Sequence, residues 1–94
     1  MTLTIARTTH GGTHKTGTLM GYTKDQLESV FGESEKASLD GKAQYSWEFD
    51  VVDENEDSFH CGIWDWKGSW EVQVWSTFGP ADMIQRAINE RLSK

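Results

Sequence analysis

The chain has 94 residues, with nine lysines and arginines against fifteen aspartates and glutamates, and a formal net charge of −6 at pH 7. A chain of this length fits one domain, residues 1–94, and buries enough apolar surface to fold without disulfides. The acidic balance disfavours direct nucleic-acid binding, which depends on basic side chains that displace counterions from phosphates. Solubility alone explains an acidic surface, and attraction to a basic partner is the alternative.

Cys61 is the single cysteine, so no internal disulfide can form. The chain also has no signal-peptide pattern at its start and no long apolar run. These features predict a reduced, cytoplasmic protein that does not associate with membranes.

Two elements are predicted in the first third of the chain. Residues 2–7 alternate and are rich in β-branched side chains, which predicts a strand. A loop rich in glycine and threonine, residues 8–18, follows it. Thr23 and Gln26 then form a capping-box pattern at the start of a helix over residues 23–31.

The middle of the chain predicts a hairpin and a third strand. Apolar and polar residues alternate over residues 45–51, the pattern of a half-buried strand. A loop over residues 53–57 would place Trp47 opposite Ile63 in the next strand. A tight turn over residues 66–69 would then bring in a third strand with Ile63 opposite Val72.

The last predicted element is a helix over residues 80–92. Pro80 suits its first turn, and Asp82 lies near its positive end. Its apolar stripe consists of Ile84, Ala87, Ile88 and Leu92. Together the elements predict an α+β fold, an antiparallel sheet of three to four strands with two helices packed on one face.

This register divides the five tryptophans between two sides of the sheet. Trp47 and Trp70 fall on the core side, Trp64 and Trp75 on the opposite side, and Trp66 where the strand enters its turn. Large rings beside polar groups are enriched at binding surfaces and homodimer seams. The alternative is that the N-terminal segment covers them, or that a bulge turns one inward. The candidate partner-binding residues are Trp64, Trp66, Trp75, Glu48, Asp50, His60 and Glu71.

The polar residues predict little chemistry. His60 is expected to contact Asp50 across the hairpin. Cys61 falls on the core side, where it is a small buried side chain rather than a nucleophile. No catalytic residues are assigned, so the chain is predicted not to be an enzyme.

The N-terminal loop is a candidate ligand site. A loop rich in glycine and threonine with one lysine resembles an anion nest. A true phosphate loop is excluded, because Thr18 and Leu19 stand where that motif needs Lys and Ser or Thr. The histidines and cysteine lack the compact spacing of a zinc site, so no metal or other cofactor is expected. The candidate ligand residues are His10, Gly12, His14 and Lys15.

Several segments carry a resemblance to known proteins. The runs GTHKTGTLMGYTKDQLESVFGE, DGKAQYSWEFDV, FHCGIWDWK and WEVQVW resemble a group of small phage-encoded proteins with a Gly-Thr-His start, a helix ending in Phe-Gly, a Trp-x-Phe strand and an Asp-Trp-Lys strand end. The similarity covers most of residues 12–92 and departs at Trp64, where the group has tyrosine, and at WEVQVW, where it has Trp-His-Ile-Gly-Gly. The unit from MGYTKDQLESVFGE to WEF is also similar to the BamE (SmpA) and beta-lactamase-inhibitor-protein group, which implies a sheet packed on helices.

The phage resemblance implies a non-enzymatic accessory protein that binds and inhibits a host factor in the bacterial cytoplasm, with an anti-defence role of the anti-CRISPR type as one form. The acidic, aromatic face implies a host protein with a basic surface, and a homodimer is the other partner considered. The alternative is a small-ligand or nucleotide-binding module in which the Gly/Thr-rich loop and the aromatic face enclose the ligand. A purely structural dimer and a metal-dependent enzyme rank after these.

Overall fold

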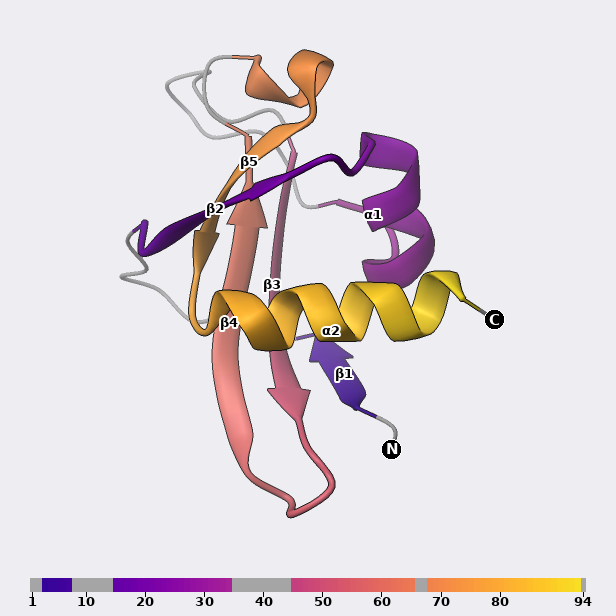
Figure 1. Cartoon of the computed structure of the whole chain (residues 1–94), viewed down its shortest axis with the longest axis vertical. Coiled ribbons are helices and arrows are strands. Elements are labelled where there is room, and N and C mark those ends of the chain that lie inside the picture. The colour runs from indigo at the N-terminus through magenta and orange to yellow at the C-terminus, as the bar shows by residue number, and fades with distance from the viewer. Residues whose placement is uncertain (1–2, 8–14, 35–44, 66–67, 94) are drawn as a thin grey trace.

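A computed structural model of the chain describes residues 3–7, 15–34, 45–65 and 68–93. These residues form a five-stranded antiparallel sheet with strand order β1-β3-β4-β5-β2, together with two α-helices and one 3-10 helix (Figure 1). The elements in chain order are β1 (Thr4–Arg7), β2 (Gly17–Met20), α1 (Lys24–Phe31), β3 (Ser46–Val52), β4 (Ser58–Trp64), η1 (Ser69–Val72), β5 (Val74–Phe78) and α2 (Ala81–Leu92). The α+β class is confirmed, and the sheet has five strands rather than three or four.

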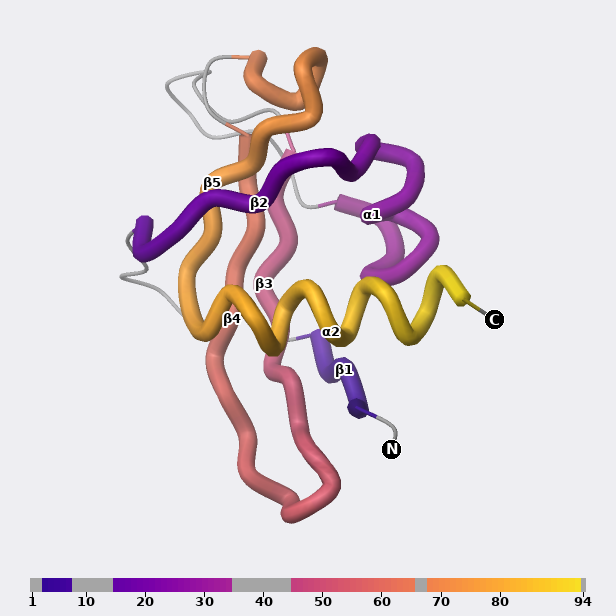
Figure 2. The backbone as a smooth tube through the Cα atoms, in the orientation of Figure 1, coloured from indigo at the N-terminus to yellow at the C-terminus, as the bar shows by residue number. Residues whose placement is uncertain are grey.

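The hairpin of β3 and β4 forms the centre of the sheet and extends past helix α2 (Figure 2). The predicted register is confirmed, with Trp47 opposite Ile63. Asp53 fixes the turn, because its Oδ1 accepts hydrogen bonds from the N–H groups of Asn55 and Asp57, at 2.9 and 3.0 Å. Buried positions alternate along β3, so one face of the hairpin forms the floor of the core.

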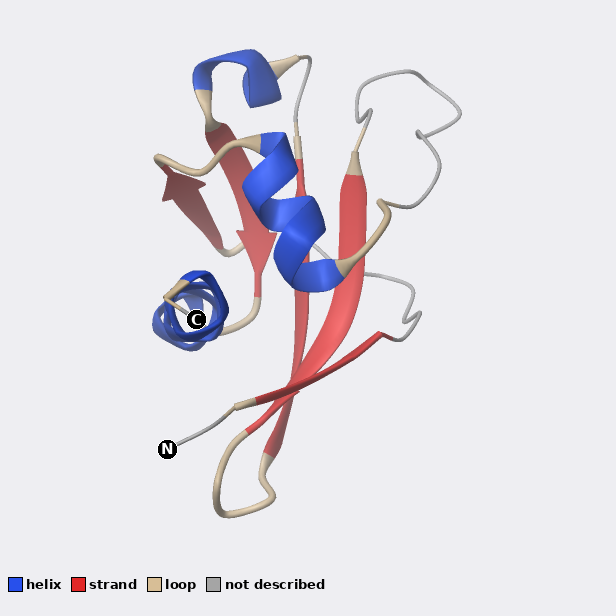
Figure 3. Cartoon of the chain, turned by 90° about the vertical axis from the view of Figure 1, so that its right-hand side faces the viewer, coloured by secondary structure: helices blue, strands red, loops and turns tan. Residues whose placement is uncertain are grey.

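Both α-helices contribute to one core on the same face of the sheet (Figure 3). Helix α2 contacts β2 and β3, whereas α1 lies beside α2 and reaches the sheet through Phe31, whose ring stacks on Phe49 with centroids 4.2 Å apart. The predicted capping box of Thr23 and Gln26 is confirmed at the start of α1. The buried core residues are Leu3, Leu19, Leu27, Phe31, Trp47, Phe49, Val51, Cys61, Ile63, Trp75, Ile84, Ala87 and Ile88.

The C-terminal end of α1 is held by side chains from two strands. Arg7 of β1 donates from Nη1 to the carbonyl oxygens of Phe31 and Glu33, at 2.6 and 2.9 Å. The indole N–H of Trp47 donates to the carbonyl oxygen of Gly32 at 2.9 Å. These bonds satisfy acceptors that a helix end leaves without an intrahelical partner.

Strand β2 stands where the sequence predicts only a loop. Gly17–Met20 pair antiparallel with β5 at the edge of the sheet. Leu19 is buried in the core, while Thr18 and Met20 are exposed. A strand of four residues has too few alternating positions to be distinguished from a loop by its pattern. Residues 8–14 of the predicted loop lie outside the described residues.

The third strand of the prediction has the wrong register. Residues Ser69–Val72 form the 3-10 helix η1, and Gln73 adopts a left-handed conformation with φ 58°. The chain therefore enters β5 later than a tight turn would allow, and Ile63 lies opposite Thr77 rather than Val72. The offset from 72 to 77 is odd, and an odd shift in register turns every side chain of a strand to the other face.

This shift exchanges the predicted environments of the residues that follow. Trp75, predicted on the side away from the core, is buried in it, and its Nε1 donates to the carbonyl oxygen of Tyr22 at 2.8 Å. Its ring meets that of Trp47 edge to face, with centroids 5.5 Å apart. Val72, predicted in the core, is 71% exposed, and Val74 faces away from the core.

Helix α2 matches the predicted helix closely, although Pro80 is its N-cap and Leu92 is partly exposed. Gly79 joins β5 to this helix with φ 97°. A Cβ atom at Gly79 would lie 2.5 Å from the carbonyl oxygen of His60 and 3.0 Å from Cys61 Sγ. The turn therefore requires glycine for both its conformation and its close approach to β4. Neither α-helix among the described residues has the length and apolar character needed to cross a membrane.

Candidate functional site

The sheet face opposite the two helices gathers four of the seven candidate partner-binding residues, and we call it the open face. Its positions alternate with the buried core positions along each strand, so the pairing between strands defines which residues share it. The open-face residues of the four strands β3, β4, β5 and β2 are Ser46, Glu48, Asp50, Val52, Ser58, His60, Gly62, Trp64, Val74, Ser76, Phe78, Thr18 and Met20.

Two aromatic residues, Trp64 and Phe78, occupy diagonal positions of the β4–β5 pair on the open face. Gly62 of β4 lies opposite Glu48 on one side and opposite Phe78 on the other. A Cβ atom at Gly62 would lie 3.6 Å from Trp64 Cζ3 and 3.9 Å from Phe78 Cβ. The indole ring of Trp64 therefore lies against the glycine, and Phe78 flanks the same glycine from β5. The placement of Trp64 away from the core is confirmed, and the side chain is half-buried.

The half of the open face formed by β3 carries the acidic residues. Glu48 and Asp50 lie on it, and His60 lies opposite Asp50. The predicted contact is confirmed: Nδ1 of His60 lies 2.6 Å from Oδ1 of Asp50. The side chain of His60 is 65% exposed and that of Asp50 is 23% exposed. Glu48, opposite Gly62, thus lies next to the aromatic pair of Trp64 and Phe78, whereas Asp50 lies further along β3 beside His60.

The half formed by β5 and β2 carries three large apolar side chains, Val74, Phe78 and Met20, beside Ser76 and Thr18, and sequence reasoning missed it. Val74 and Phe78 reach this face only because the register of β5 differs from the predicted one. Met20 of β2 lies opposite Val74 and is 65% exposed. The sequence does contain one signal for this arrangement, because the pair Gly79 and Pro80 marks the end of the strand at Phe78.

The remaining partner-binding candidates do not join the open face. Trp75 is in the core, and Trp66 lies outside the described residues. Glu71 is exposed on η1. It borders a hollow of about 220 Å³ at the start of α1, which is lined by Thr23, Lys24, Asp25, Trp70, Glu71 and Gln73. The sequence predicts Trp70 to lie in the core. It is half-buried and packs at the margin of the core, where its ring meets Tyr45 edge to face.

The candidate ligand loop falls mostly outside the described residues. His10, Gly12 and His14 belong to residues 8–14, and Lys15 is exposed just before β2. Among the described residues, no three His, Cys, Asp or Glu side chains gather as metal ligands would.

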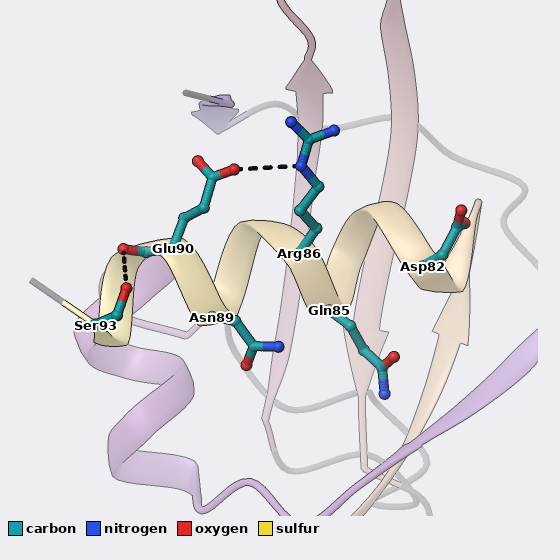
Figure 4. A pocket seen from close by; sticks show the side chains of 6 residues that line it. All are labelled: Asp82, Gln85, Arg86, Asn89, Glu90 and Ser93. Carbon is teal, nitrogen blue, oxygen red and sulfur yellow. Dashed lines mark hydrogen bonds and ion pairs between the residues drawn. The ribbon is translucent and has the colours of Figure 1, made fainter. Parts of the chain in front are cut away.

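A second hollow, of about 560 Å³, runs along the outer side of α2 (Figure 4). All its lining residues are polar or charged, and they come from this helix and from its C-cap, Ser93. Glu90 forms an ion pair with Arg86 at 3.3 Å, and its Oε1 accepts the N–H of Leu3 at 3.0 Å. The bond from Leu3, reinforced by Arg86, lowers the pKa of Glu90 below its ordinary value. The hollow lacks the apolar walls typical of small-molecule sites.

Cys61 is fully buried on the core side of β4, as predicted. Burial, together with the negative charge of Asp50, raises the pKa of its thiol from 9.0 to about 12. The thiolate is the reactive form of cysteine, so Cys61 is unsuited to nucleophilic chemistry.

We expect Cys61 to resist thiol reagents in the folded protein. Its pKa leaves about one thiol in ten thousand ionised at pH 8, and the surrounding core excludes the reagent. The measurement is the reaction with Ellman's reagent at pH 8 with and without urea. The native protein should react at least about 100-fold more slowly than the unfolded chain. Comparable rates would contradict the burial of this residue.

Comparisons of the chain with protein-family models, with curated protein sequences and with solved structures found no match.

Proposed function

We propose that the protein is a non-enzymatic phage accessory protein that binds a host protein with a basic surface and inhibits it, with an anti-defence role as one form of this activity. The open face is the contact surface. The observation that carries the proposal is the aromatic pair of Trp64 and Phe78 on the face opposite the helices, with the carboxylate of Glu48 next to it and that of Asp50 further along the same strand.

The chemistry of this surface suits arginine and lysine side chains. A guanidinium group is attracted both to the face of an indole ring and to carboxylates. Tryptophan is also among the residues that contribute most to binding energy at protein interfaces. The net charge of −6 favours the approach of a basic partner from a distance. The resemblance to phage-encoded proteins supports a bacterial host protein as that partner.

The first test compares two substitutions that reverse the charge of a glutamate and leave the tryptophans unchanged. A tagged protein captures its partner from bacterial lysate, and binding to the purified partner is then measured for Glu48→Lys and Glu71→Lys. Each substitution raises the net charge by two, but Glu48 lies on the open face and Glu71 lies on η1. Glu48→Lys should weaken binding at least about tenfold more than Glu71→Lys, because close charge pairs act over short distances in salt. Equal effects would contradict the proposed surface.

Trp64→Ala provides the second test. We expect it to weaken partner binding by about 30-fold or more, the effect of a hot-spot residue, while the chain stays folded at the temperature of the binding measurement, with the modest loss of stability expected for a half-buried ring. Inhibition of the partner's own activity should weaken in parallel. If Trp64→Ala leaves both binding and inhibition unchanged, the open face is not the contact surface.

The ligand-binding alternative rests on the Gly/Thr-rich loop, most of which lies outside the described residues. Both hollows described above are lined by polar and charged side chains apart from Trp70, and nothing in them favours a nucleotide.

A further inference from the structure

The outer edge of β2 is a second surface, distinct from the centre of the open face. β2 is the last strand of the sheet, and no other strand lies beyond it in the described part of the chain. Gly21 donates its N–H to the carbonyl oxygen of Gln73 at 3.0 Å, and this pair continues the β2–β5 register. Backbone groups alternate in direction along an antiparallel strand, so those of Thr18 and Met20 point toward the outer edge.

This edge lacks two of the features that usually keep edge strands from pairing with another chain. Natural edges are protected by charged side chains, prolines, bulges or short length. β2 is short, but residues 16–23 contain neither a charged residue nor a proline. Met20 on this strand is 65% exposed. The opposite edge differs, because β1 ends in Arg7, which is bound to the end of α1.

We propose that β2 pairs antiparallel with β2 of a second copy of the chain, about a two-fold axis at Leu19. In this register Thr18 of each copy lies opposite Met20 of the other, and the outward N–H and C=O groups of both residues are satisfied. Met20 is then covered by Thr18 of the second copy. The two sheets join edge to edge with both open faces on the same side.

The charges around the edge favour a second copy as the occupant. Two chains of net charge −6 repel each other, but residues 16–23 bring no carboxylate to the junction. The charged residues that flank this stretch are Lys15, just before β2, and Lys24, which begins α1 and is paired with Glu28 at 2.7 Å. The strand therefore offers no carboxylate to a basic partner, and its uncharged residues suit pairing with a copy of the same strand.

The proposal goes beyond the proposed function, because it gives each assembly two open faces rather than one. An assembly with two contact surfaces binds a dimeric or repeated partner more tightly than a single surface does. The strand is short and the interface is small, so we expect a dissociation constant on the order of 0.1 mM.

Sedimentation velocity over a range from about 10 µM to 1 mM tests the dimer. The wild type should shift from monomer to dimer across this range. Thr18→Pro should raise the dissociation constant at least about tenfold while leaving the melting temperature near that of the wild type. The reason is that proline removes an N–H that points outward and is tolerated on edge strands. A wild type that stays monomeric at 1 mM overturns the proposal.

A matched pair of charge variants separates edge pairing from general repulsion. Thr18→Lys and Ala6→Lys both add one positive charge at an exposed position of an edge strand. Thr18→Lys should weaken the dimer at least about tenfold more, since it places like charges on both sides of the junction. Equal effects of the two variants would overturn the assignment to β2.

The register is tested by cross-linking. Thr18 and Met20 of facing copies form a hydrogen-bonded pair with Cα atoms about 5.5 Å apart, within reach of a disulfide. A mixture of Thr18→Cys and Met20→Cys should therefore cross-link under mild oxidation faster than either variant alone, and the buried Cys61 does not interfere. Equal rates for the mixture and the single variants would overturn the register.

The dimer and the proposed function fail separately. Trp64→Ala removes the aromatic pair of the open face and should leave the dimer intact. If Trp64→Ala dissociates the dimer while Thr18→Pro does not, the copies meet through the open face and the edge pairing is wrong. If the dimer forms as expected but no host protein binds, the β2 pairing stands and the proposed inhibitor function is contradicted.

Discussion

Replacing Trp75 with alanine is expected to lower the free energy of unfolding by about 3–5 kcal/mol, the usual cost of truncating a buried tryptophan. The side chain is fully buried and contacts the ring of Trp47. Its truncation also leaves the carbonyl oxygen of Tyr22 without the indole donor. Urea unfolding followed by circular dichroism measures the change, since Trp47 and the other tryptophans make fluorescence a mixed signal.

Two variants on neighbouring positions serve as controls for Trp75→Ala. Val72→Ala should change stability by less than about 0.5 kcal/mol, because the side chain is 71% exposed. Trp64→Ala should cost about 1–2 kcal/mol, since its ring is half-buried on the open face. If Val72→Ala proved as costly as Trp75→Ala, β5 would have the register of a tight hairpin.

Gly79→Ala is expected to destabilise the fold by about 2–5 kcal/mol, through two physical causes. The backbone conformation at φ 97° is strained for any residue with a side chain, at a cost of roughly 1–3 kcal/mol. The added methyl group would also overlap the carbonyl oxygen of His60, 2.5 Å away, and relieving such overpacking costs about 1–3 kcal/mol more. Thermal and urea unfolding both measure this loss.

Gly21→Ala is the matched control for that change. Gly21 also has a positive φ, 87°, but no atom lies within 4 Å of a Cβ atom built there. This variant should show the backbone cost alone, about 1–2 kcal/mol. The difference between the two variants therefore measures the steric contribution of the close approach between Gly79 and β4. A variant pair with equal losses would mean that the turn at Gly79 moves away from β4 without cost.

The β3–β4 hairpin could be predicted from sequence because its signals agree. Alternation over residues 45–51 and a loop over residues 53–57 lead to the same register, and this register places Trp64 on the open face. The third strand could not be predicted in this way. The run from Trp70 to Val74 alternates as a strand would, but its first residues form η1, and only contacts elsewhere in the fold fix where pairing begins.

Edge position and packing explain the other differences. β2 has four residues and becomes a strand because it pairs with β5. This pairing depends on residues far away in the sequence, so the local pattern of residues 17–20 does not reveal it. Met20 of β2 joins the open face for the same reason, whereas Val74 joins it because the register of β5 differs from the predicted one. Helix α1, by contrast, can be predicted from Thr23 and Gln26, because capping interactions are local in sequence.

The hydrogen bonds at the end of α1 also constrain the order in which the chain folds. An isolated helix of eight residues is unstable in water, because the cost of nucleation is recovered over too few hydrogen bonds. The donors that complete this helix are Arg7 and Trp47, which come together only when β1 has paired with β3. We therefore expect the helix to form late in folding, after a contact between residues 4–7 and the middle of the chain has closed a long loop.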